Sequence, residues 1–566
     1  MGTSRSDVSS GRQWSGGSRR GGGAVFAQRQ LDYAVGRRTA SMRRSARPSL
    51  KRVLIANRGE IALRIIRACR DAEIESVAVY SDADRTARHV RAADHARHIG
   101  PAPAAESYLV GGRIVEAALR CGADAVHPGY GFLSERADFA ASCEAAGLVF
   151  IGPSPETLAR LGDKLAARRA AISAEVPIVP GTFEPLRTDS PQAMAEVAAE
   201  AERIGWPLLV KAAAGGGGRG MRRVDHPAEL AAAIAAATRE AAAAFGDGAV
   251  YLERFVEGGR HVEVQLLGDD HGTVVALGER DCSVQRRHQK LVEEAPAPGL
   301  STKQRRMVHT LAVRIAATVG LRNAATAEFL LTPNGDFYFL EVNARLQVEH
   351  GVTELVTGLD LVREQLAIAA GSPLSPPVLA AAASAAEPTH HAIEVRISAE
   401  HPLTDFAPAP GKITRWREPG GPGIRIDAGV EEGTVVTPEY DPLLAKLLVV
   451  APDREAALAR LRRALREFEV GGIQTTLPFH HWLVDQTDFV VGRLRTDLVA
   501  LTWDPEPLWR AAAGRAAEAV AQLAAHEAHE AQASGGTRME LTGGQETGST
   551  GAWQEAGRQE AVDRWS

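Results

Sequence analysis

Hydrophobic and polar residues alternate in two short runs on either side of the segment 333–336 (PNGD). Alternation with a period of two is typical of β-strands, and Asn-Gly between two such runs predicts a β-hairpin, because both residues tolerate positive φ. If Asn334 and Gly335 form a two-residue turn, the register of the hairpin is fixed. Glu328 then lies directly opposite Glu341.

Two carboxylates that face each other across a β-ladder repel, so we expect something positive between them. Hard oxygen ligands suit Mg²⁺ or Mn²⁺. Asn343 follows Glu341 by two residues and lies on the same face, which makes it a candidate for a third ligand. The hairpin therefore predicts a divalent metal site formed by Glu328, Glu341 and Asn343.

The alternation of polar residues continues beyond the hairpin through Arg345, Gln347 and Glu349. A strand that continued in this way would place a row of polar groups beside the predicted metal site. The same register also places Phe337 and Phe339 on this face. An ordinary exposed face of an edge hairpin is therefore the alternative interpretation.

Strand and helix patterns alternate in the first part of the chain that is predicted to fold. A buried strand is predicted at 52–56, a helix at 60–71 and a second strand at 76–80, which is typical of a parallel α/β domain. The turn at 57–59 lacks the spaced glycines of a dinucleotide-binding fingerprint, so no nicotinamide cofactor is predicted. The segment 127–135 (HPGYGFLSE) follows another predicted strand, where open α/β sheets bind ligands.

A predicted strand at 207–210 ends at Lys211 and leads into a glycine-rich loop at 215–220, after which 221–224 continue as a strand. A Walker P-loop has its lysine after the glycines, at the start of a helix. Here the lysine precedes the glycines, so the pattern predicts a hairpin whose backbone N–H groups close over phosphates. A flexible linker is the alternative interpretation, because glycine clusters are common in linkers.

The rest of the chain divides by composition. The segment 279–290 is dense in cations, and taken alone it predicts a solvated charged loop. Helical spacing predicts a helix at 303–319. An Ala/Pro/Ser-rich linker is predicted at 372–388 and a compact β-rich domain at 389–500. Residues 501–566 predict an Ala/Glu-rich helix and then a Gly/Thr/Gln-rich tail that is disordered from about 534.

The composition limits the classes of protein to which this chain could belong. A chain of 566 residues with 45% hydrophobic and 24% charged residues predicts about three or four globular domains. The formal net charge of −5 does not favour binding to nucleic acid or to an anionic membrane surface. No apolar run reaches the roughly 18 residues that a membrane span requires. The four cysteines form no CxxC pair, which favours a reducing cytosol or organelle matrix.

Residues 1–50 contain ten arginines and only two acidic residues, Asp7 and Asp32. A segment so rich in Ser, Gly and Arg does not bury enough apolar surface to fold, so it is predicted to be disordered or a leader. A transit peptide would imply an organelle matrix. A misassigned upstream start codon would leave the protein in the cytoplasm, and both interpretations stay open.

Lysine is scarce, with seven residues among the 65 lysines and arginines. Lysine provides a compact point charge that the planar arginine fork does not replace, so each lysine is expected to have a specific role. Lys51 and Lys303 are attributed to chance. The full set is Lys51, Lys164, Lys211, Lys290, Lys303, Lys412 and Lys446.

Six motifs follow one another along the chain between about residues 51 and 498. They are NRGEIA at 57–62, HPGYGFLSE at 127–135, Lys211 with its glycine loop, ERDCS at 279–283, QRRHQK at 285–290 and EVNARLQVEH at 341–350. Together they closely resemble biotin carboxylase, the ATP-grasp component of biotin-dependent carboxylases of the acetyl-/propionyl-CoA carboxylase type. Their order and spacing match the family's.

The resemblance implies a multidomain protein of α/β and α+β class. Its parts would be an N-terminal parallel α/β domain (51–163), an ATP-grasp domain with a glycine-loop lid (164–371, the lid at about 181–252), the linker (372–388) and a β-rich C-terminal biotin carboxylase domain (389–500). The implied cofactors are ATP and Mg²⁺ or Mn²⁺. The implied reaction converts ATP and bicarbonate to ADP and carboxyphosphate, whose CO₂ is captured by the ureido nitrogen of biotin.

The family's functional residues carry over by motif. Those implied to contact ATP are Lys164, Lys211, Gly215, Gly216, Gly217, Gly218, Glu253, Arg254, Val256, His261, Gln285, His288, Glu328 and Glu341, with adenine at 253–256. The implied metal ligands are Glu328, Glu341 and Asn343, in agreement with the hairpin register. The implied bicarbonate pocket consists of Lys290, Arg345, Gln347 and Val348. The implied catalytic residues are Lys290, Arg345, the base Glu349, and Arg396, which stabilises the biotin enolate.

The chain departs from the family pattern at three places. Ala212–Ala214 replace a stretch where Ser and a fifth glycine are usual, the hairpin starts ATAE at 325–328 where GTFE is usual, and Gly351 stands where Pro is usual. None of these changes removes a catalytic side chain. Because Glu349 lies among cations, which lower the pKa of a carboxyl group, we expect it to be ionised at neutral pH.

No methionine–lysine pair of the kind that carries biotin occurs in the sequence, and no lysine follows Lys446. Biotin is therefore expected on a separate biotin carboxyl carrier protein, alongside carboxyltransferase subunits, and a homodimer is expected from the family. The alternatives are an ATP-grasp ligase that activates a different carboxylate and a non-catalytic ATP-binding subunit. The polar row from Arg345 to Glu349, together with Arg396, argues against the first alternative, and the intact acids and bases argue against the second.

Overall fold

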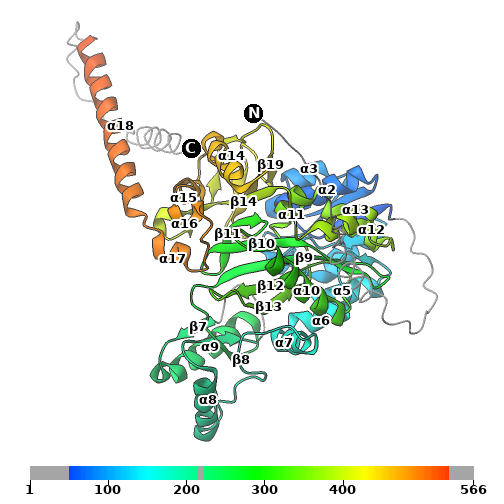
Figure 1. The fold of residues 1–566 in the computed structure, drawn as a ribbon. Helices are drawn as coiled ribbons and strands as arrows, with labels where there is room; N and C mark the ends of the chain where they lie inside the picture. The colour runs from blue at the N-terminus through cyan, green and yellow to red at the C-terminus, as the bar shows by residue number, and fades with distance from the viewer. Residues whose placement is uncertain (1–49, 214–220, 534–566) are drawn as a thin grey trace, which may run out of the picture. The chain divides into compact units, whose positions relative to one another are not determined.

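The computed structural model describes residues 50–213 and 221–533. Residues 1–49 of the predicted leader, the predicted phosphate contacts Gly215–Gly218 and the predicted disordered tail from 534 lie outside the described residues. Figure 1 shows the described elements with the labels used below. No helix in the described ranges combines the length and the apolar character needed to cross a membrane.

The N-terminal part contains a five-stranded parallel sheet in the order β3-β2-β1-β4-β5. Apolar positions of its first helix repeat with helical spacing, and Ile61, Ile65 and Ile66 are buried there. The predicted parallel α/β fold is confirmed. The elements are β1 (Arg52–Ile55), α2 (Gly59–Asp71), β2 (Glu75–Ser81), α3 (Arg88–Ala92), β3 (His95–Gly100), α4 (Gly111–Arg120), β4 (Ala125–His127), α5 (Ala137–Ala145), β5 (Val149–Phe150), α6 (Pro155–Gly162) and α7 (Lys164–Ser173).

The side chain of Asn57 joins the turn after β1 to the glycine-bearing loop after β4. Its Nδ2 donates hydrogen bonds to the carbonyl oxygens of Pro128 and Tyr130, both at 2.7 Å. Gly129 has a φ of +64°, and a Cβ there would lie 2.9 Å from the same nitrogen, so glycine is required. The turn and the loop therefore form one rigid unit at the carboxyl ends of the parallel strands.

Three antiparallel strands form a separate small sheet in the order β7-β6-β8. Its apolar residues and those of two helices make a core of their own, and Figure 1 shows these elements as one group. Lys211 lies opposite Met221 in the ladder, which confirms that a strand, and not a helix, follows the glycine loop. The elements are α8 (Pro191–Ile204), β6 (Leu208–Ala212), β7 (Met221–Val224), α9 (Leu230–Phe245) and β8 (Val250–Arg254).

The largest sheet has eight antiparallel strands in the order β13-β12-β9-β10-β11-β14-β21-β19. Because β11 pairs with β14, the predicted ATP-grasp and C-terminal domains share one continuous sheet. Helix α10 (Thr302–Thr318) packs in one apolar core with β9 and β12. The strands are β9 (Arg260–Gly268), β10 (Val274–Arg286), β11 (Gln289–Ala295), β12 (Asn323–Leu331), β13 (Phe337–Asn343), β14 (His391–Ser398), β19 (Ile424–Ala428) and β21 (Leu443–Ala451).

The cation-rich segment 279–290 is not the solvated loop that its composition alone predicts. It forms the second half of β10, a turn and the start of β11. Arg280 is fully buried and Asp281 is 1% exposed. Burial of these charges is possible because they are paired within the sheet, Arg280 with Glu263 and Asp281 with Arg260.

The β12–β13 hairpin has the predicted pairing of Glu328 with Glu341 but not the predicted turn. The backbone N–H of Thr332 donates to the carbonyl oxygen of Asp336 at 2.9 Å, so the loop between them has three residues instead of two. Leu340 is an extra residue in β13, which shifts the register back by one position. The two deviations cancel, and the acidic pair forms as predicted.

The bulge at Leu340 also changes which side chains share a face. Phe337 and Phe339 are 3% and 1% exposed and pack in the core, whereas Glu341 is only partly buried. The prediction that both phenylalanines lie on the face of the acids is therefore wrong. One extra residue moves every side chain before it to the opposite face, because side chains alternate along a strand.

The C-terminal part adds short ladders and helices to the large sheet. The segment 372–388, predicted as a linker, contains the helix α13, which begins because Ser375 caps it and proline occupies its first turn. The helices are α11 (His350–Thr357), α12 (Leu361–Ala369), α13 (Pro376–Ser384), α14 (Arg454–Glu467), α15 (Leu477–Leu483), α16 (Thr487–Val490), α17 (Leu498–Thr502) and α18 (Glu506–Ala533). The ladders pair β15 (Glu400–His401) with β16 (Ala407–Pro408), β17 (Gly411–Lys412) with β20 (Val435–Val436), and β18 (Arg415–Arg417) with β22 (Glu469–Gly471).

Candidate active site

Glu349, the predicted base, lies at the start of α11 and is fully buried. Its Oε1 accepts a hydrogen bond from Lys290 Nζ at 2.6 Å, and its Oε2 accepts one from Arg396 Nη2 at 3.0 Å. Lys290 comes from β11 and Arg396 from β14. Three residues with predicted catalytic roles are thus brought together from segments that are far apart in the sequence.

The charges around Glu349 determine its protonation. Burial acts to raise the pKa of Glu349, but the charges of Lys290 and Arg396 outweigh it and hold the pKa well below its usual value. Burial likewise acts to lower the pKa of Lys290, but the surrounding glutamates raise it well above its usual value. Glu349 is therefore ionised at neutral pH, and Lys290 is charged.

Glu263 and Arg280 support Lys290 and were not among the predicted site residues. Glu263 Oε2 accepts a hydrogen bond from Lys290 Nζ at 2.6 Å, and Arg280 Nε donates to Glu263 Oε1 at 2.5 Å. Arg280 also donates to the hydroxyl of Thr353 on α11 at 2.8 Å. Glu263 and Arg280 face each other across β9 and β10, and only the register of that ladder could have identified them.

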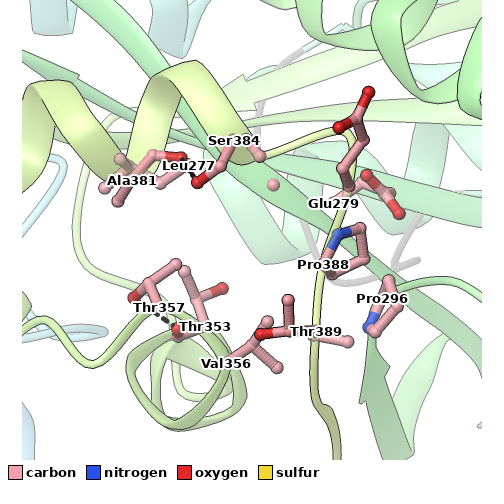
Figure 2. A pocket seen from close by; sticks show the side chains of 14 residues that line it. Leu277, Glu279, Pro296, Thr353, Val356, Thr357, Ala381, Ser384, Pro388 and Thr389 are labelled. Atoms are coloured by element: carbon pink, nitrogen blue, oxygen red, sulfur yellow. Dashed lines mark hydrogen bonds between the residues drawn. The ribbon is translucent and has the colours of Figure 1, made fainter. Parts of the chain in front are cut away.

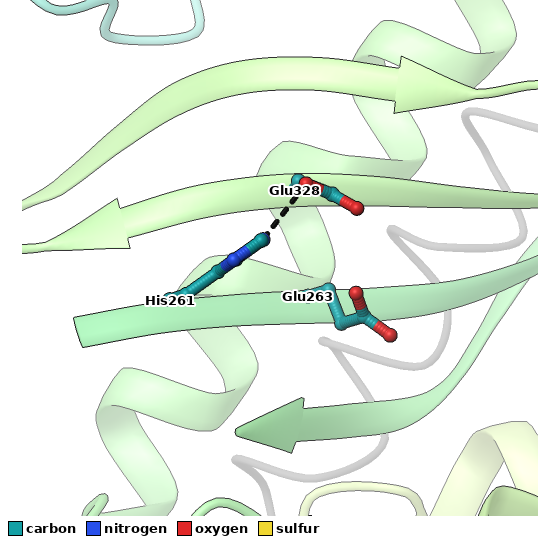
Figure 3. A group of neighbouring side chains, drawn as sticks. All are labelled: His261, Glu263 and Glu328. Carbon is teal, nitrogen blue, oxygen red and sulfur yellow. Dashed lines mark ion pairs between the residues drawn. The ribbon is translucent and has the colours of Figure 1, made fainter. Parts of the chain in front are cut away.

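Glu328, a predicted metal ligand, is 6% exposed and surrounded by nitrogen atoms. His261 Nε2 lies 2.8 Å from its Oε2, Lys290 Nζ lies 3.0 Å from its Oε1, and Asn343 Nδ2 donates to the same Oε1 at 2.8 Å. Figure 3 shows His261 directed at Glu328, with Glu263 beside them on β9. Burial acts to raise the pKa of Glu328, but Lys290 and His261 outweigh it, so the pKa is lowered.

Glu341 faces Glu328 across the ladder but has a more open environment. Its side chain is 33% exposed, and Lys164 Nζ lies 3.7 Å from its Oε2. Two carboxylates and an amide offer hard oxygen donors of the kind that Mg²⁺ and Mn²⁺ prefer. The donor set fits a divalent ion, although the amide of Asn343 must turn to present its oxygen, because its nitrogen faces Glu328 here.

The polar residues beyond β13 do not continue as a strand, because the strand ends at Asn343. Arg345 Nη1 donates to Gln347 Oε1 at 2.9 Å, and Gln347 Nε2 donates to Glu328 Oε1 at 3.4 Å. Arg345 Nε also donates to Glu135 Oε2, in the loop after β4, at 2.9 Å. The predicted strand continuation is wrong, but its polar groups still meet beside Glu328 on an irregular loop.

Lys211 is held in place by Glu253 on the neighbouring strand. Lys211 Nζ donates to Glu253 Oε2 at 2.6 Å, and the other carboxylate oxygen of Glu253 pairs with Arg168 on α7. Burial acts to lower the pKa of Lys211, but the charge of Glu253 outweighs it and the pKa is raised. The backbone N–H of the next residue, Arg254, donates to the carbonyl oxygen of Pro180 at 2.8 Å.

Three other predicted ATP contacts lie just after β8 and around the β10–β11 connection. Val256 follows β8 and is partly buried. Gln285 lies opposite Lys290 in the β10–β11 ladder and is 9% exposed. His288 is exposed in the turn that joins these strands, with a φ of 68°.

A cavity of about 200 Å³ lies beside α11 and α13, and no predicted site residue lines it. Figure 2 shows Thr353 and Thr357 on one side of the cavity and Ser384 on the other. Thr353 connects this cavity to the site, because its hydroxyl accepts the hydrogen bond from Arg280.

Comparison with known proteins matches three family models along the chain. They are described as "Biotin carboxylase, N-terminal domain" (residues 49–158), "Carbamoyl-phosphate synthase L chain, ATP binding domain" (163–376) and "Biotin carboxylase C-terminal domain" (394–500). The biotin carboxylase of Allochromatium vinosum is 50% identical over 443 residues, which is 78% of this chain and 96% of that protein. The biotin-dependent acyl-coenzyme A carboxylase alpha3 subunit of Mycobacterium leprae is 49% identical over 438 residues, which is 77% of this chain and 71% of that protein.

A solved structure has a similar fold. It is the biotin carboxylase domain dimer of Hydrogenobacter thermophilus 2-oxoglutarate carboxylase, in complex with MgADP, ADP and bicarbonate. It superposes with a TM-score of 0.76 at 44% sequence identity, and the match covers 80% of this chain and 98% of that one.

Proposed function

The chain belongs to the biotin carboxylase family, and we propose that it carboxylates biotin with bicarbonate at the expense of ATP, as the first half-reaction of an acyl-CoA carboxylase. The observation that carries this proposal is the buried Glu349 carboxylate, which Lys290 and Arg396 contact from two sides. A base among fixed cations suits the reaction of a small anion with ATP, because those cations also offset the negative charge that accumulates.

ATP binds between the lid and the large sheet in this proposal. Lys211 and Lys164 contact the phosphates, and adenine lies at 253–256. The 2.6 Å contact with Glu253 holds the Lys211 ammonium in one position before nucleotide arrives. This arrangement reduces the ordering that binding requires.

Glu328 and Glu341 are the residues that would hold Mg²⁺ or Mn²⁺, with Asn343 as a further ligand. When bound, the ion supplies charge neutralisation for the phosphates of ATP. His261 and Lys290 keep Glu328 ionised and in a fixed orientation. Glu341 remains accessible from the nucleotide side.

Bicarbonate lies between the base and the phosphates. Arg345, Gln347 and the backbone of Val348 bind it, and the guanidinium fork suits its planar geometry. Glu349 takes its proton, an oxygen of the resulting carbonate attacks the γ-phosphorus, and the bond to ADP breaks. Lys290 contacts both Glu349 and Glu328, so its charge lies between the base and the phosphate-binding side.

Biotin receives the one-carbon unit after carboxyphosphate releases CO₂. The phosphate released together with CO₂ accepts the ureido N–H proton of biotin, Arg396 stabilises the negative charge on the resulting enolate, and the ureido nitrogen then attacks CO₂. The Arg396 guanidinium is already oriented, because its Nε donates to Glu293 Oε1 at 2.7 Å while Nη2 contacts Glu349. Arg396 therefore connects the base to the biotin site.

The biotin is carried by a separate carrier protein in this proposal, and carboxyltransferase subunits consume the carboxybiotin. The similarity to the acyl-coenzyme A carboxylase of Mycobacterium leprae supports an acyl-CoA as the final acceptor. The chain forms a homodimer in this proposal. The biotin carboxylase domain of the Hydrogenobacter enzyme, described as a dimer, supports that part.

ATP cleavage measured with and without bicarbonate and free biotin tests the proposal. We expect ADP release that requires bicarbonate and increases with biotin. ADP release that ignores both would favour a ligase for a different carboxylate. Nucleotide binding without any turnover would identify a non-catalytic subunit.

A further inference from the structure

Lys446 is one of the seven lysines and has no part in the steps of the proposed reaction. It lies on β21 and is fully buried, although an ammonium group is rarely buried without strong partners. Its Nζ donates to the carbonyl oxygen of Val348 at 2.9 Å and lies 3.1 Å from Glu60 Oε1. Val348 directly precedes Glu349, so Lys446 holds the backbone from which the base extends.

The position of Lys446 in the sheet explains this contact. Lys446 pairs with Arg396 on one side and with Asp427 on the other, so all three side chains lie on one face of the sheet. Asp427 Oδ2 lies 3.8 Å from Lys446 Nζ. Lys446 is thus the immediate neighbour of the proposed biotin-binding arginine but is sealed from solvent.

Glu60 extends the contact to the N-terminal sheet. It lies in the first turn of α2, and the hydroxyl of Tyr130, in the loop after β4, donates to its Oε1. A Cβ at Gly429, which directly follows β19, would lie 2.6 Å from the backbone nitrogen of Glu60, so the chain approaches α2 there more closely than any other residue would permit. Lys446 therefore joins three segments that carry family motifs, at Glu60, Tyr130 and Val348.

We propose that Lys446 is a positioning residue for the catalytic base: its ammonium fixes the peptide at Val348 and Glu349, so that the carboxylate and the bicarbonate pocket keep their relative geometry. The proposal rests on the function proposed above. We assign Lys446 a positioning role and not a catalytic one, because its ammonium contacts the carbonyl oxygen of Val348 and the carboxylate of Glu60, and neither group reacts in the proposed function. Lysine is required because one compact cation must reach a carbonyl and a carboxylate at once.

Lys446→Met removes the ammonium and keeps the length of the side chain. We expect the KM for bicarbonate to increase and kcat to decrease, together by about tenfold to a hundredfold, which corresponds to loss of a hydrogen bond from a charged donor. The affinity for ATP, measured by calorimetric titration, should stay within about twofold of the native value, since Lys446 contacts no lid residue. Native bicarbonate kinetics in this variant would overturn the proposal.

A second variant distinguishes a positioning role of Lys446 from a role that is limited to neutralising nearby buried acids. Lys446→Met leaves the Glu60 carboxylate without its cation, which lowers stability. Adding Glu60→Gln removes that unpaired charge, so the melting temperature should recover in the double variant while the bicarbonate defect persists. Recovery of the KM and kcat together with the melting temperature would mean that Lys446 is only structural.

Arg64→Met is a matched control. Arg64 lies one turn after Glu60 on α2, and its buried guanidinium pairs with Glu354 and Asp360 without contacting the loop at 345–349. We expect this variant to lose stability with a native KM for bicarbonate. If it reproduces the bicarbonate defect of Lys446→Met, the effect is not specific to Lys446 and the proposal is wrong.

Two different results would exclude the function of the chain and the role of Lys446. If the native protein shows no bicarbonate-dependent ATP cleavage, the proposed function fails and the role of Lys446 fails with it. If the native protein is active and Lys446→Met has the same bicarbonate kinetics, only the positioning role is excluded.

Discussion

The two glutamates of the hairpin face each other, yet they belong to two differently built regions. The base region, around Glu349 and Glu328, is buried, and each carboxylate contacts cations or donors at 3.0 Å or less. The nucleotide region, around Glu341, is open: that side chain is 33% exposed and Lys164 Nζ lies 3.7 Å from it.

The two regions differ in where the charges that compensate their carboxylates come from. In the base region the protein supplies every compensating charge itself, which fixes the geometry before substrates bind. In the nucleotide region compensation is incomplete, which suits a place where a metal–nucleotide complex brings its own charges. Substitutions in the base region should therefore affect chemistry, and those in the nucleotide region should affect binding.

Glu349→Gln should have the largest effect, because it removes the base without changing its size. Bicarbonate-dependent ATP cleavage should fall by about 10²–10⁴-fold, the usual contribution of a positioned proton acceptor. ATP affinity should stay native. Glu364→Gln, on α12 outside the site, is a control that should leave turnover unchanged. Turnover near the native rate in Glu349→Gln would remove this residue as the base.

Glu328→Gln and Glu341→Gln compare the two regions directly. Both should raise the Mg²⁺ concentration needed for half-maximal activity by about tenfold, which corresponds to loss of one charged ligand. Only Glu328→Gln should also lower stability, by about 3–5 kcal/mol, because it breaks a buried ion pair with Lys290 and His261. An unchanged Mg²⁺ requirement in both variants would count against the facing-pair site.

The pH dependence should reveal Glu293, which orients Arg396. Burial raises the pKa of Glu293 from 4.5 to about 7, Arg396 opposes this effect and Glu349 adds to it. Below that pH the protonated carboxyl holds Arg396 less firmly, so biotin-dependent turnover should fall several-fold as the pH drops through about 7. Lys290 also acts to lower the pKa of Glu293, and Glu394 lies directly opposite Glu293 on the neighbouring strand β14.

Stability should depend on pH in the opposite sense. The pKa of Glu293 is higher in the folded than in the unfolded protein, so folding is favoured at low pH and this contribution is lost as the pH rises from about 4.5 to about 7. Glu293→Gln should remove both dependences. A turnover profile that keeps the same acid limb in this variant would assign the limb to another group.

Gly335→Ala should have the smallest effect and should spare catalysis. Gly335 has a φ of 91°, which an L-residue with a Cβ adopts only with strain. A loss of about 1 kcal/mol in the free energy of unfolding, measured by urea denaturation, is expected with native turnover. A change in turnover larger than about twofold would show that the hairpin tip and the acidic pair are coupled.

The hairpin shows how far the sequence alone could predict this site. The Asn-Gly signal and the alternation correctly paired Glu328 with Glu341, because those patterns are local. They did not predict the three-residue loop or the bulge at Leu340, since no local signal marks an extra residue. The two errors cancelled at the acids but placed Phe339 on the wrong face.

Residues that depend on long-range pairing were beyond prediction. Arg280 appeared to belong to a solvated charged loop, and only its pairing with Glu263 across β9 and β10 explains its burial. The scarcity of lysine predicted a specific role for Lys446. The sequence could not show its contact with Val348, because the two residues are 98 positions apart. The family resemblance singled out Glu349, Lys290 and Arg396, and in the structure Lys290 and Arg396 both contact Glu349, while the roles themselves stay a prediction.

The most direct test of the central claim follows labelled bicarbonate into biotin. Native protein with ATP, Mg²⁺, free biotin and labelled bicarbonate should form labelled carboxybiotin in step with ADP. Glu349→Gln should bind ATP with native affinity and form the product about 10²-fold more slowly or less. Equal rates of label transfer in the two proteins, or ADP release by the native protein without any labelled product, would contradict the account.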